Sequence, residues 1–173
     1  MIKKKIVFSA IFISIFSIYI NYVSGYVGIL PIDSFAFFDT GYLILQGYHP
    51  FKDFWITTGF LVDYFQAFFF KVWGVKWGSY VLHAAFLNCI FSLSIFIFFI
   101  KNNLNVYLSS LYAISGSILF YPTIGTPFAY HHSYLFSVIS VLLLSLIIKK
   151  SSNLLWFFLP VSMLISFLCM QTP

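Results

Sequence analysis

The sequence predicts an all-α polytopic membrane protein, and three observations carry that prediction. Charged residues make up 8% of the 173-residue chain and hydrophobic residues 61%, whereas soluble domains carry about 25% charged residues. Several apolar runs approach the roughly 20 residues that cross a bilayer as a helix. The nine basic residues are all lysines and lie near the ends of these runs. Such scatter is typical of topology anchors, so no nucleic-acid partner is expected.

The first expected span covers 6–28 and follows the basic start MIKKK. Its apolar run is longer than the roughly 7–15 residues of a signal peptide, so we expect a retained helix, with cleavage near Ser24-Gly25 as the alternative. The polar stretches KNNLN and KKSSN predict short connections, and the prolines and glycine of PTIGTPFA predict a turn. The four further spans are expected at 79–100, 104–121, 130–148 and 154–170.

The segment 58–74 either spans the membrane or lies along its surface as an amphipathic helix. A spanning helix here would bury Asp63 at a cost of roughly 2.5–3.5 kcal/mol and would erase the bias of lysines toward one side. We therefore expect an interfacial helix, with Asp63 facing water or headgroups. About five spans then remain. They place the N-terminus in the cytoplasm and the loop 29–78 outside a bacterial plasma membrane.

All four aspartates of the chain fall between positions 33 and 63. Within this loop, 34–46 reads as a first interfacial helix, with Asp33 as its N-cap and Gly47 as its C-terminal stop. Each acid has an ordinary explanation: Asp33 caps a helix, Asp39 is a surface carboxylate, and Asp53 pairs with Lys52 or belongs to a turn. These separate explanations do not explain why all four acids lie in one loop.

The order of motifs in this loop resembles a known family. Asp33 is followed by Leu45-Gln46-Gly47, then by YHPFKDF, Thr58-Gly59 and FKVWG. This pattern resembles the first extracytoplasmic loop of the GT-C glycosyltransferases, which include protein O-mannosyltransferases, aminoarabinose transferases and family 39 relatives. The resemblance covers roughly 1–173 and implies that the chain is the N-terminal part of a larger transmembrane domain. Two positions depart from the family pattern: Ser34 replaces a second acid, and Met170-Gln171 stands where a Lys-Gln pair is common.

The resemblance implies transfer of a sugar from a polyprenyl-phosphate donor, with inversion, to a glycan, lipid or protein acceptor at the membrane. Asp33 is the expected base. A phosphate leaving group needs no protonation by a second carboxylate, so one base suffices. A divalent metal requirement is left open, and a zinc site is not favoured because no second ligand pair is visible. The residues expected to bind substrate are Asp39, Lys52, Asp53, Lys71, His131 and His132.

Two alternatives stay open. For the pair His131-His132, a solvated helix start is favoured over phosphate binding. The whole chain also fits a non-catalytic polytopic protein, such as a transporter or an assembly subunit. Transporters place ionisable groups near the membrane midplane, whereas the expected spans of this chain hold no acid and offer only polar residues such as Asn88 and His83. That difference favours the transferase.

Overall fold

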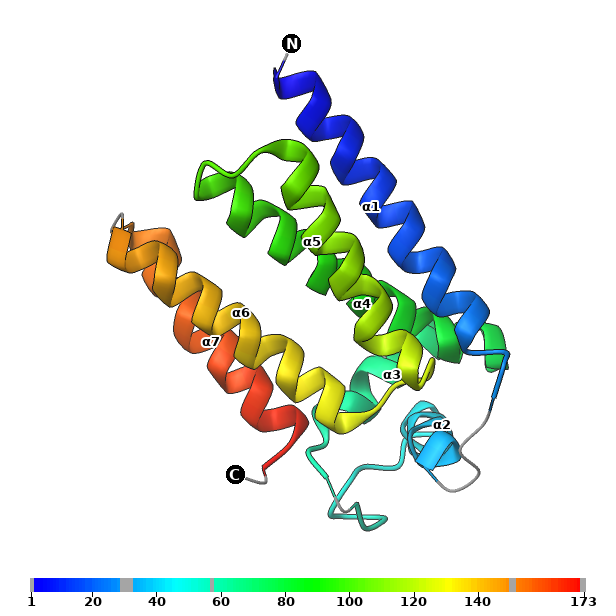
Figure 1. Cartoon of the computed structure of the whole chain (residues 1–173). Helices are drawn as coiled ribbons and strands as arrows, with labels where there is room; N and C mark the ends of the chain where they lie inside the picture. Colours follow the sequence, from blue (N-terminus) through cyan, green and yellow to red (C-terminus); the bar gives the residue numbers. More distant parts are fainter. Residues whose placement is uncertain (1, 29–32, 57, 150–151, 172–173) are drawn as a thin grey trace.

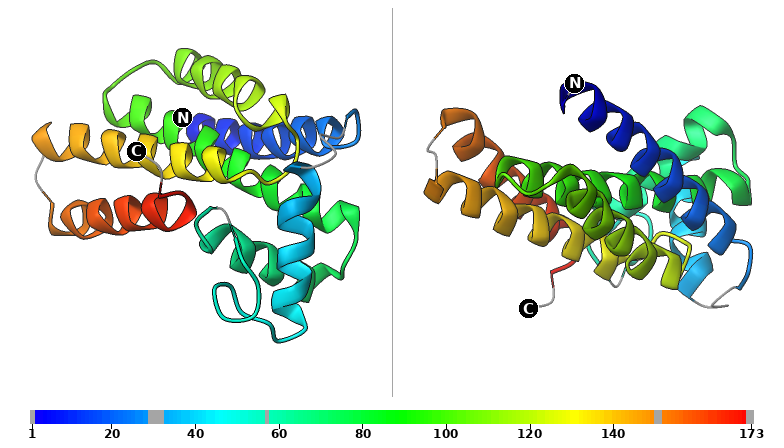
Figure 2. Two further views of the ribbon diagram at one scale, coloured as in Figure 1. Left: turned by 90° about the horizontal axis from the view of Figure 1, so that it is seen from below. Right: turned by 45° about the horizontal axis from the view of Figure 1, so that its top comes forward.

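The computed structural model of the chain is all-α and describes residues 2–28, 33–56, 58–149 and 152–171. Five apolar helices run side by side, and α2 lies crosswise at one end of them, with α3 packed beside it (Figure 1, Figure 2). The elements are α1 (Ile2–Ser24), α2 (Asp33–Leu45), α3 (Leu61–Trp73), α4 (Trp77–Lys101), α5 (Val106–Leu119), the 3₁₀ turn η1 (Tyr121–Thr123), α6 (Ala129–Lys149) and α7 (Asn153–Cys169).

Helices α1, α4 and α5 pack against one another. The Asn88 amide on α4 donates to the carbonyl of Ser17 on α1 at 3.1 Å and to that of Ser117 on α5 at 2.9 Å. Nearer one end, Ile13, Phe96 and Ala113 pack together as a buried apolar cluster. In surroundings without water, a polar side chain that bonds two neighbours at once fixes how the helices are placed. Asn88 therefore joins α4 to both α1 and α5.

Lys5, Lys101 and Lys149 lie at one end of the bundle, whereas Lys71 and Lys76 lie at the end of the bundle where α3 meets α4. The Lys5 amine lies 5.7 Å from the centroid of the Tyr107 ring at the start of α5. Lys149 at the end of α6 donates a hydrogen bond to Asn102, which follows α4. The start of α1 and the ends of α4 and α6 therefore share one end of the bundle, and α2 occupies the other (Figure 1).

Three helices, α1, α4 and α6, are long and apolar enough to cross a membrane over the described residues. The sequence predicted five such spans. Helix α5 stops after 14 residues because the chain turns into η1 at Tyr121, and α7 has 17 residues with Pro160 inside it. Both run alongside longer neighbours (Figure 1), α5 against α1 and α4, and α7 against α6.

The predicted helix in the first loop is confirmed to within one residue. Gly47 ends it with φ at +90°, and the amide of Tyr48 donates to the carbonyl of Leu43 at 3.1 Å. This left-handed glycine with a bond spanning the last turn is a Schellman motif, which glycine forms without steric cost. Asp33 is the first residue of α2 rather than a residue preceding it.

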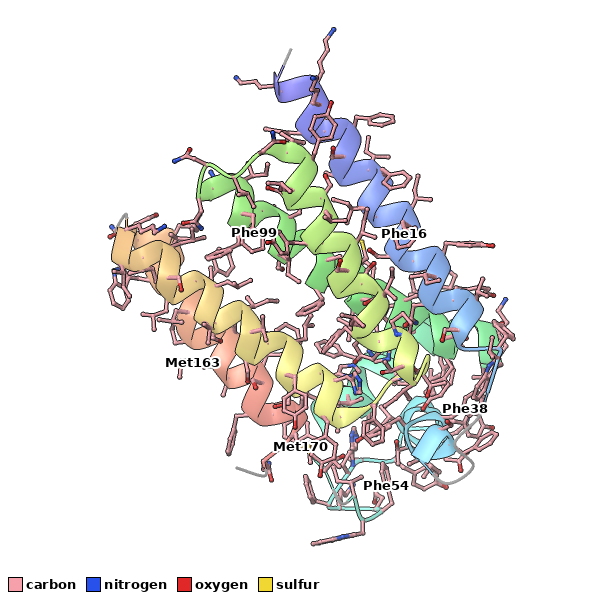
Figure 3. The ribbon with its side chains drawn as sticks, in the orientation of Figure 1. Phe16, Phe38, Phe54, Phe99, Met163 and Met170 are labelled. Atoms are coloured by element: carbon pink, nitrogen blue, oxygen red, sulfur yellow. The ribbon has the colours of Figure 1, made fainter. Side chains whose placement is uncertain are left out.

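Helices α2 and α3 cover the end of the bundle through aromatic contacts. The Phe38 ring of α2 packs edge-on against Phe70 of α3 at 4.8 Å and against Tyr80 of α4 at 5.4 Å between centroids (Figure 3). Aromatic pairs in this geometry contribute about 0.5–1.5 kcal/mol beyond the apolar area they bury. Aromatic packing against α3 and α4 therefore holds α2 in its crosswise position.

Helices α6 and α7 are joined by serine hydroxyls. Ser166 lies 3.0 Å from Ser133 and 2.8 Å from Ser137, and Ser140 lies 2.8 Å from Ser162, each measured between hydroxyl oxygens. Small hydroxyl residues allow close approach of helices in an apolar medium. At the end of α7, the carbonyl of Cys169 accepts a bond from the amide of Gly59 at 3.2 Å, which attaches this hairpin to the first loop.

Candidate functional site

A cavity of about 280 Å³ lies between α2, α3 and the segment that joins them. Two carboxylates, two hydroxyls and one indole meet there on otherwise apolar walls. Small-molecule sites usually have a mostly apolar lining with a few polar groups. We therefore take this cavity as the candidate site. Its lining residues are Ala36, Phe37, Asp39, Thr40, Trp55, Ile56, Thr58 and Asp63.

Asp63 is the most unusual residue of the cavity. Only 1% of its surface is exposed, so the expectation that it faces water or headgroups is wrong: α2 packs on this face of α3 and covers it. Burial raises the pKa of the Asp63 carboxyl to about 6, while the hydrogen bond from Thr40 opposes the rise. Among the described residues, Oδ2 of Asp63 has no hydrogen-bond partner.

Thr40 is placed to serve both protonation states of Asp63. Its hydroxyl oxygen contacts Oδ1 of Asp63 and lies 2.9 Å from the carbonyl of Ala36. A hydroxyl carries a single proton, so Thr40 donates either to the carboxylate or to the carbonyl. Above about pH 6 it donates to the ionised Asp63; below that pH, a protonated Asp63 can donate to Thr40, which then donates to Ala36.

The other carboxylate of the cavity belongs to Asp39 on α2, which is exposed. Asp39 and Asp63 come from different helices, and only the packing of α2 on α3 brings them to one cavity. The predicted base, Asp33, begins α2. Its side chain lies outside the described part of the structure.

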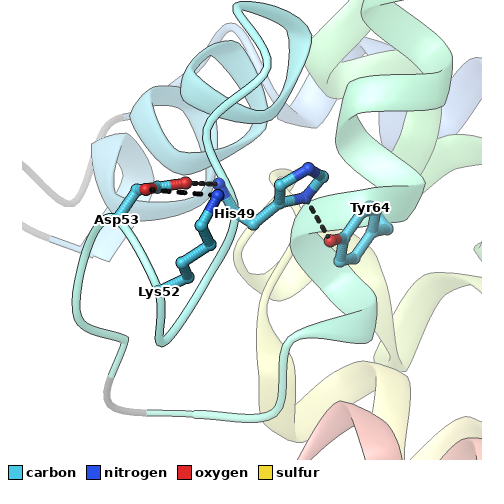
Figure 4. Close-up of polar contacts among 4 residues, drawn as sticks. All are labelled: His49, Lys52, Asp53 and Tyr64. Carbon is cyan, nitrogen blue, oxygen red and sulfur yellow. Dashed lines mark hydrogen bonds and ion pairs between the residues drawn. The ribbon is translucent and has the colours of Figure 1, made fainter.

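The YHPFKDF motif forms a compact turn on α3 (Figure 4). The Asp53 carboxylate accepts a hydrogen bond from the amide of His49 at 2.8 Å, and the Asp53 amide donates to the His49 carbonyl at 2.9 Å. Nδ1 of His49 lies 3.0 Å from the hydroxyl of Tyr64, which docks the turn on α3. Asp53 thus holds the turn together, as a turn residue would, and it does not line the cavity.

The two lysines predicted to bind substrate are exposed at different places. Lys52 is 77% exposed, with its amine 4.0 Å from Asp53, so the predicted pairing of these neighbours is confirmed at the limit of an ion pair. Lys71 lies in the last turn of α3 and is exposed. Neither lysine lines the cavity of Asp39 and Asp63.

The histidine pair does not form a solvated helix start. His132 is fully buried, and its Nε2 lies 3.0 Å from Nε2 of His83 on α4. Nδ1 of His83 lies 2.9 Å from Oε1 of Gln66 on α3. These contacts continue as a row of hydrogen bonds, because the Tyr121 hydroxyl lies 2.5 Å from Nδ1 of His132. Sequence reasoning noted His83 only as a polar residue within a span and did not link it to His132.

Each neutral histidine donates through one ring nitrogen and accepts through the other, so the direction of one hydrogen bond in this row sets the direction of the others. If the Gln66 oxygen accepts from Nδ1–H of His83, then Nε2 of His83 accepts from His132, and Nδ1 of His132 accepts from Tyr121. The reverse order is also available, because the Phe128 carbonyl lies 2.8 Å from Nδ1 of His132 and the Gln66 amide can turn over. A single proton lies between the two Nε2 atoms in either order. His132 therefore joins three helices and is not free to bind substrate.

His131 differs from its neighbour. It is partly exposed, its ring packs 5.2 Å from Phe120 and 5.1 Å from Tyr121 between centroids, and its Nδ1 has no partner among the described residues.

Within the described residues, no group of three or more histidine, cysteine, aspartate or glutamate side chains is placed to hold a metal ion. The side chain of Asp33 is not among the described ones. A divalent metal requirement therefore stays an expectation.

No protein-family model, curated protein sequence or solved structure gives a significant match to this chain. The class that the fold defines is an all-α protein with three candidate membrane-spanning helices in the described part of the chain.

Proposed function

We propose that this chain forms the part of a GT-C-type membrane glycosyltransferase that binds a polyprenyl-phosphate sugar and an acceptor. The acceptor is a glycan, lipid or protein, and the reaction inverts the anomeric carbon. The observation that carries the proposal is the cavity between α2 and α3, where Asp39, Asp63 and Trp55 meet at one end of an apolar bundle. A lipid-linked sugar presents its head at such a boundary between hydrocarbon and water.

The composition of the cavity suits one sugar ring. Its volume of about 280 Å³ lies just below the roughly 300–1,000 Å³ of sites for drug-sized ligands. Carboxylates such as Asp39 accept hydrogen bonds from sugar hydroxyls, and the indole of Trp55, 80% exposed, offers a flat apolar face to the ring. Asp39 is thus the proposed sugar-binding carboxylate.

Asp33 is the proposed base. It stands at the register position three and four residues before Ala36 and Phe37, both of which line the cavity, and residues at these spacings share one face of a helix. A departing phosphate is already a good leaving group, so the reaction needs a base on the acceptor hydroxyl but no acid on the leaving oxygen. A glycosidase, by contrast, needs both.

Charge that develops on the departing phosphate needs cationic partners. Lys52, 77% exposed in the first loop, is the proposed partner. His131 is the remaining histidine candidate, since the nitrogens of His132 are held within the hydrogen-bonded chain.

The distribution of charge supports an extracytoplasmic site. Lys5, Lys101 and Lys149 lie at one end of the bundle, and the described acids lie in α2, α3 and their connection. Cytoplasmic ends carry the excess of lysine, so the N-terminus is proposed to be cytoplasmic and the cavity extracytoplasmic. The shorter α5 and α7 would complete five crossings in a plasma membrane.

One observation favours the competing transporter function: His83 and His132 are buried in α4 and α6, two candidate spans. Ionisable residues in spans often relay protons. A proton-coupled transporter would acidify or alkalinise liposomes when its solute is added, and the transferase would not.

The proposal is tested by binding to the purified chain in detergent. A polyprenyl-phosphate sugar and the same polyprenyl phosphate without sugar are titrated while tryptophan fluorescence is followed. The sugar should add affinity, and Asp39→Asn should remove that gain while the matched change Asp53→Asn keeps it. Equal affinity for the two lipids would overturn the proposal.

A further inference from the structure

A second, larger cavity of about 520 Å³ lies between α3, α4 and α6, away from the carboxylates. Its lining is apolar apart from one histidine. Its one titratable neighbour, His83, has its nitrogens engaged with Gln66 and His132 and offers the cavity only its ring. The lining residues are Phe65, Phe68, Phe69, His83, Phe86, Leu87, Ile90 and Phe136.

Water does not fill such a space, because a buried water needs two to four polar partners. The cavity instead opens between two candidate spans, where Phe68 and Phe86 are 57% and 49% exposed. With α4 and α6 in a membrane, the hydrocarbon of the bilayer would surround these side chains. A flexible hydrocarbon chain is the occupant that this lining accepts.

A cationic group lies next to the opening. Lys71 follows Phe68 by three residues on α3, and residues at that spacing are neighbours on a helix surface. Lys71 is exposed and has no ion pair among the described residues. Trp73, which stacks on the cavity residue Phe69 at 5.1 Å, is of the type enriched at headgroup level.

We propose that this cavity binds one acyl chain of an anionic phospholipid of the surrounding bilayer, with the phosphate of that lipid at Lys71. The pairing of an apolar cavity with a lysine one helical turn away matches a phospholipid, which carries its charge at one end of its chains. This binding is independent of sugar transfer: the lipid is a bound component of the membrane, not the donor.

The test uses the full chain in nanodiscs with phosphatidylglycerol or phosphatidylcholine that carries a photoreactive group in the middle of one acyl chain. Peptides that crosslink are then mapped by mass spectrometry. Phosphatidylglycerol should label residues 65–69 and 86–90 more densely than the exposed apolar face of α1, which contacts bulk lipid. Equal labelling of α1 and the cavity would overturn the proposal.

Matched charge variants decide the role of Lys71. Lys71→Gln should lower labelling of the cavity by phosphatidylglycerol about fivefold, the usual effect of one lysine near anionic lipid, and should leave labelling by phosphatidylcholine unchanged. Lys52→Gln, which removes the same charge elsewhere in the first loop, should change neither. Equal losses in both variants would show general attraction and contradict the proposal.

A cavity-filling variant and a competitor complete the design. Ile90→Trp should abolish cavity labelling by both lipids if it folds, and the mapping on the unaltered chain decides the matter if it does not. Displacement of phosphatidylglycerol by an equimolar polyprenyl phosphate would overturn the phospholipid assignment, because the cavity would then belong to the donor.

Discussion

The hydroxyl of Thr40 on α2 contacts Oδ1 of Asp63 on α3, and this contact is the only described hydrogen bond of a carboxylate with 1% of its surface exposed. It joins the two helices that form the walls of the candidate site. Its strength depends on the charge of Asp63, so the local structure is linked to pH.

The first prediction concerns stability against pH. Burial raises the pKa of Asp63 from 3.8 to about 6 in the folded protein, so the folded state binds more protons than the unfolded state between these values. Stability is therefore fully present below about pH 4, falls as pH rises through about 6, and stays lower above it. A gap of about two pH units corresponds to on the order of 3 kcal/mol.

Asp63→Asn removes this titration. The variant should have a higher thermal unfolding midpoint than the natural protein at pH 8 and nearly the same midpoint at pH 4, as measured in detergent. A natural protein that is the more stable of the two at pH 8 would show that ionised Asp63 is stabilised by its surroundings.

The second prediction isolates the Thr40 contact. Thr40→Val removes the donor and leaves a buried carboxylate unpaired, which should cost about 1–3 kcal/mol at pH 8 and less at pH 4, where the neutral acid needs less compensation. Thr40→Ser keeps the hydroxyl and should lose much less. Equal losses for Val and Ser at pH 8 would place the effect in packing rather than in the hydrogen bond.

Local sequence signals predicted the helices well, because their ends carry recognisable chemistry. Gly47 adopts the left-handed backbone conformation that glycine favours directly after the end of a helix. The turn predicted by PTIGTPFA is confirmed as η1 and the loop that follows it. The number of apolar runs was predicted, whereas the lengths of α5 and α7 were not, because hydropathy does not show where packing turns the chain.

The site was less accessible to sequence reasoning, because it depends on contacts between distant segments. Asp63 is covered only because α2 packs on α3, and His132 is buried because η1 brings Tyr121 beside it. No pattern within one helix encodes either contact. A polar residue on an apolar helix face, such as His83 or Gln66, was the one available signal.

The third prediction tests the histidine chain. His132→Leu removes the partner of both the Tyr121 hydroxyl and Nε2 of His83, so it should destabilise the fold by about 2 kcal/mol or more. His131→Leu is the matched control, since Nδ1 of His131 already lacks a partner, and it should cost much less. Thermal unfolding of the two variants side by side decides this, and the reverse ranking would contradict the account.

The fourth prediction concerns the attachment of α7 to the first loop. A Cβ added at Gly59 would lie 2.1 Å from the backbone oxygen of Leu168, which cannot move without shifting the helix end. Gly59→Ala should therefore destabilise the fold by about 1–3 kcal/mol and make the C-terminal end of α7 easier to cleave. Gly28→Ala, where a Cβ would meet nothing within 4 Å, should behave like the natural protein. Equal protease sensitivity of the natural protein, Gly59→Ala and Gly28→Ala would argue against a close contact between Gly59 and the end of α7.

The central claim is that a lipid-linked sugar reacts at the α2–α3 cavity with Asp33 as base. The most direct measurement is transfer of radiolabelled sugar from polyprenyl-phosphate donors in membranes that carry the natural protein, Asp33→Asn, or the matched control Asp53→Asn. Loss of a general base costs about 100-fold or more in rate. We predict that loss for Asp33→Asn, with normal membrane expression, and near-normal transfer for Asp53→Asn; undiminished transfer by Asp33→Asn would contradict the account.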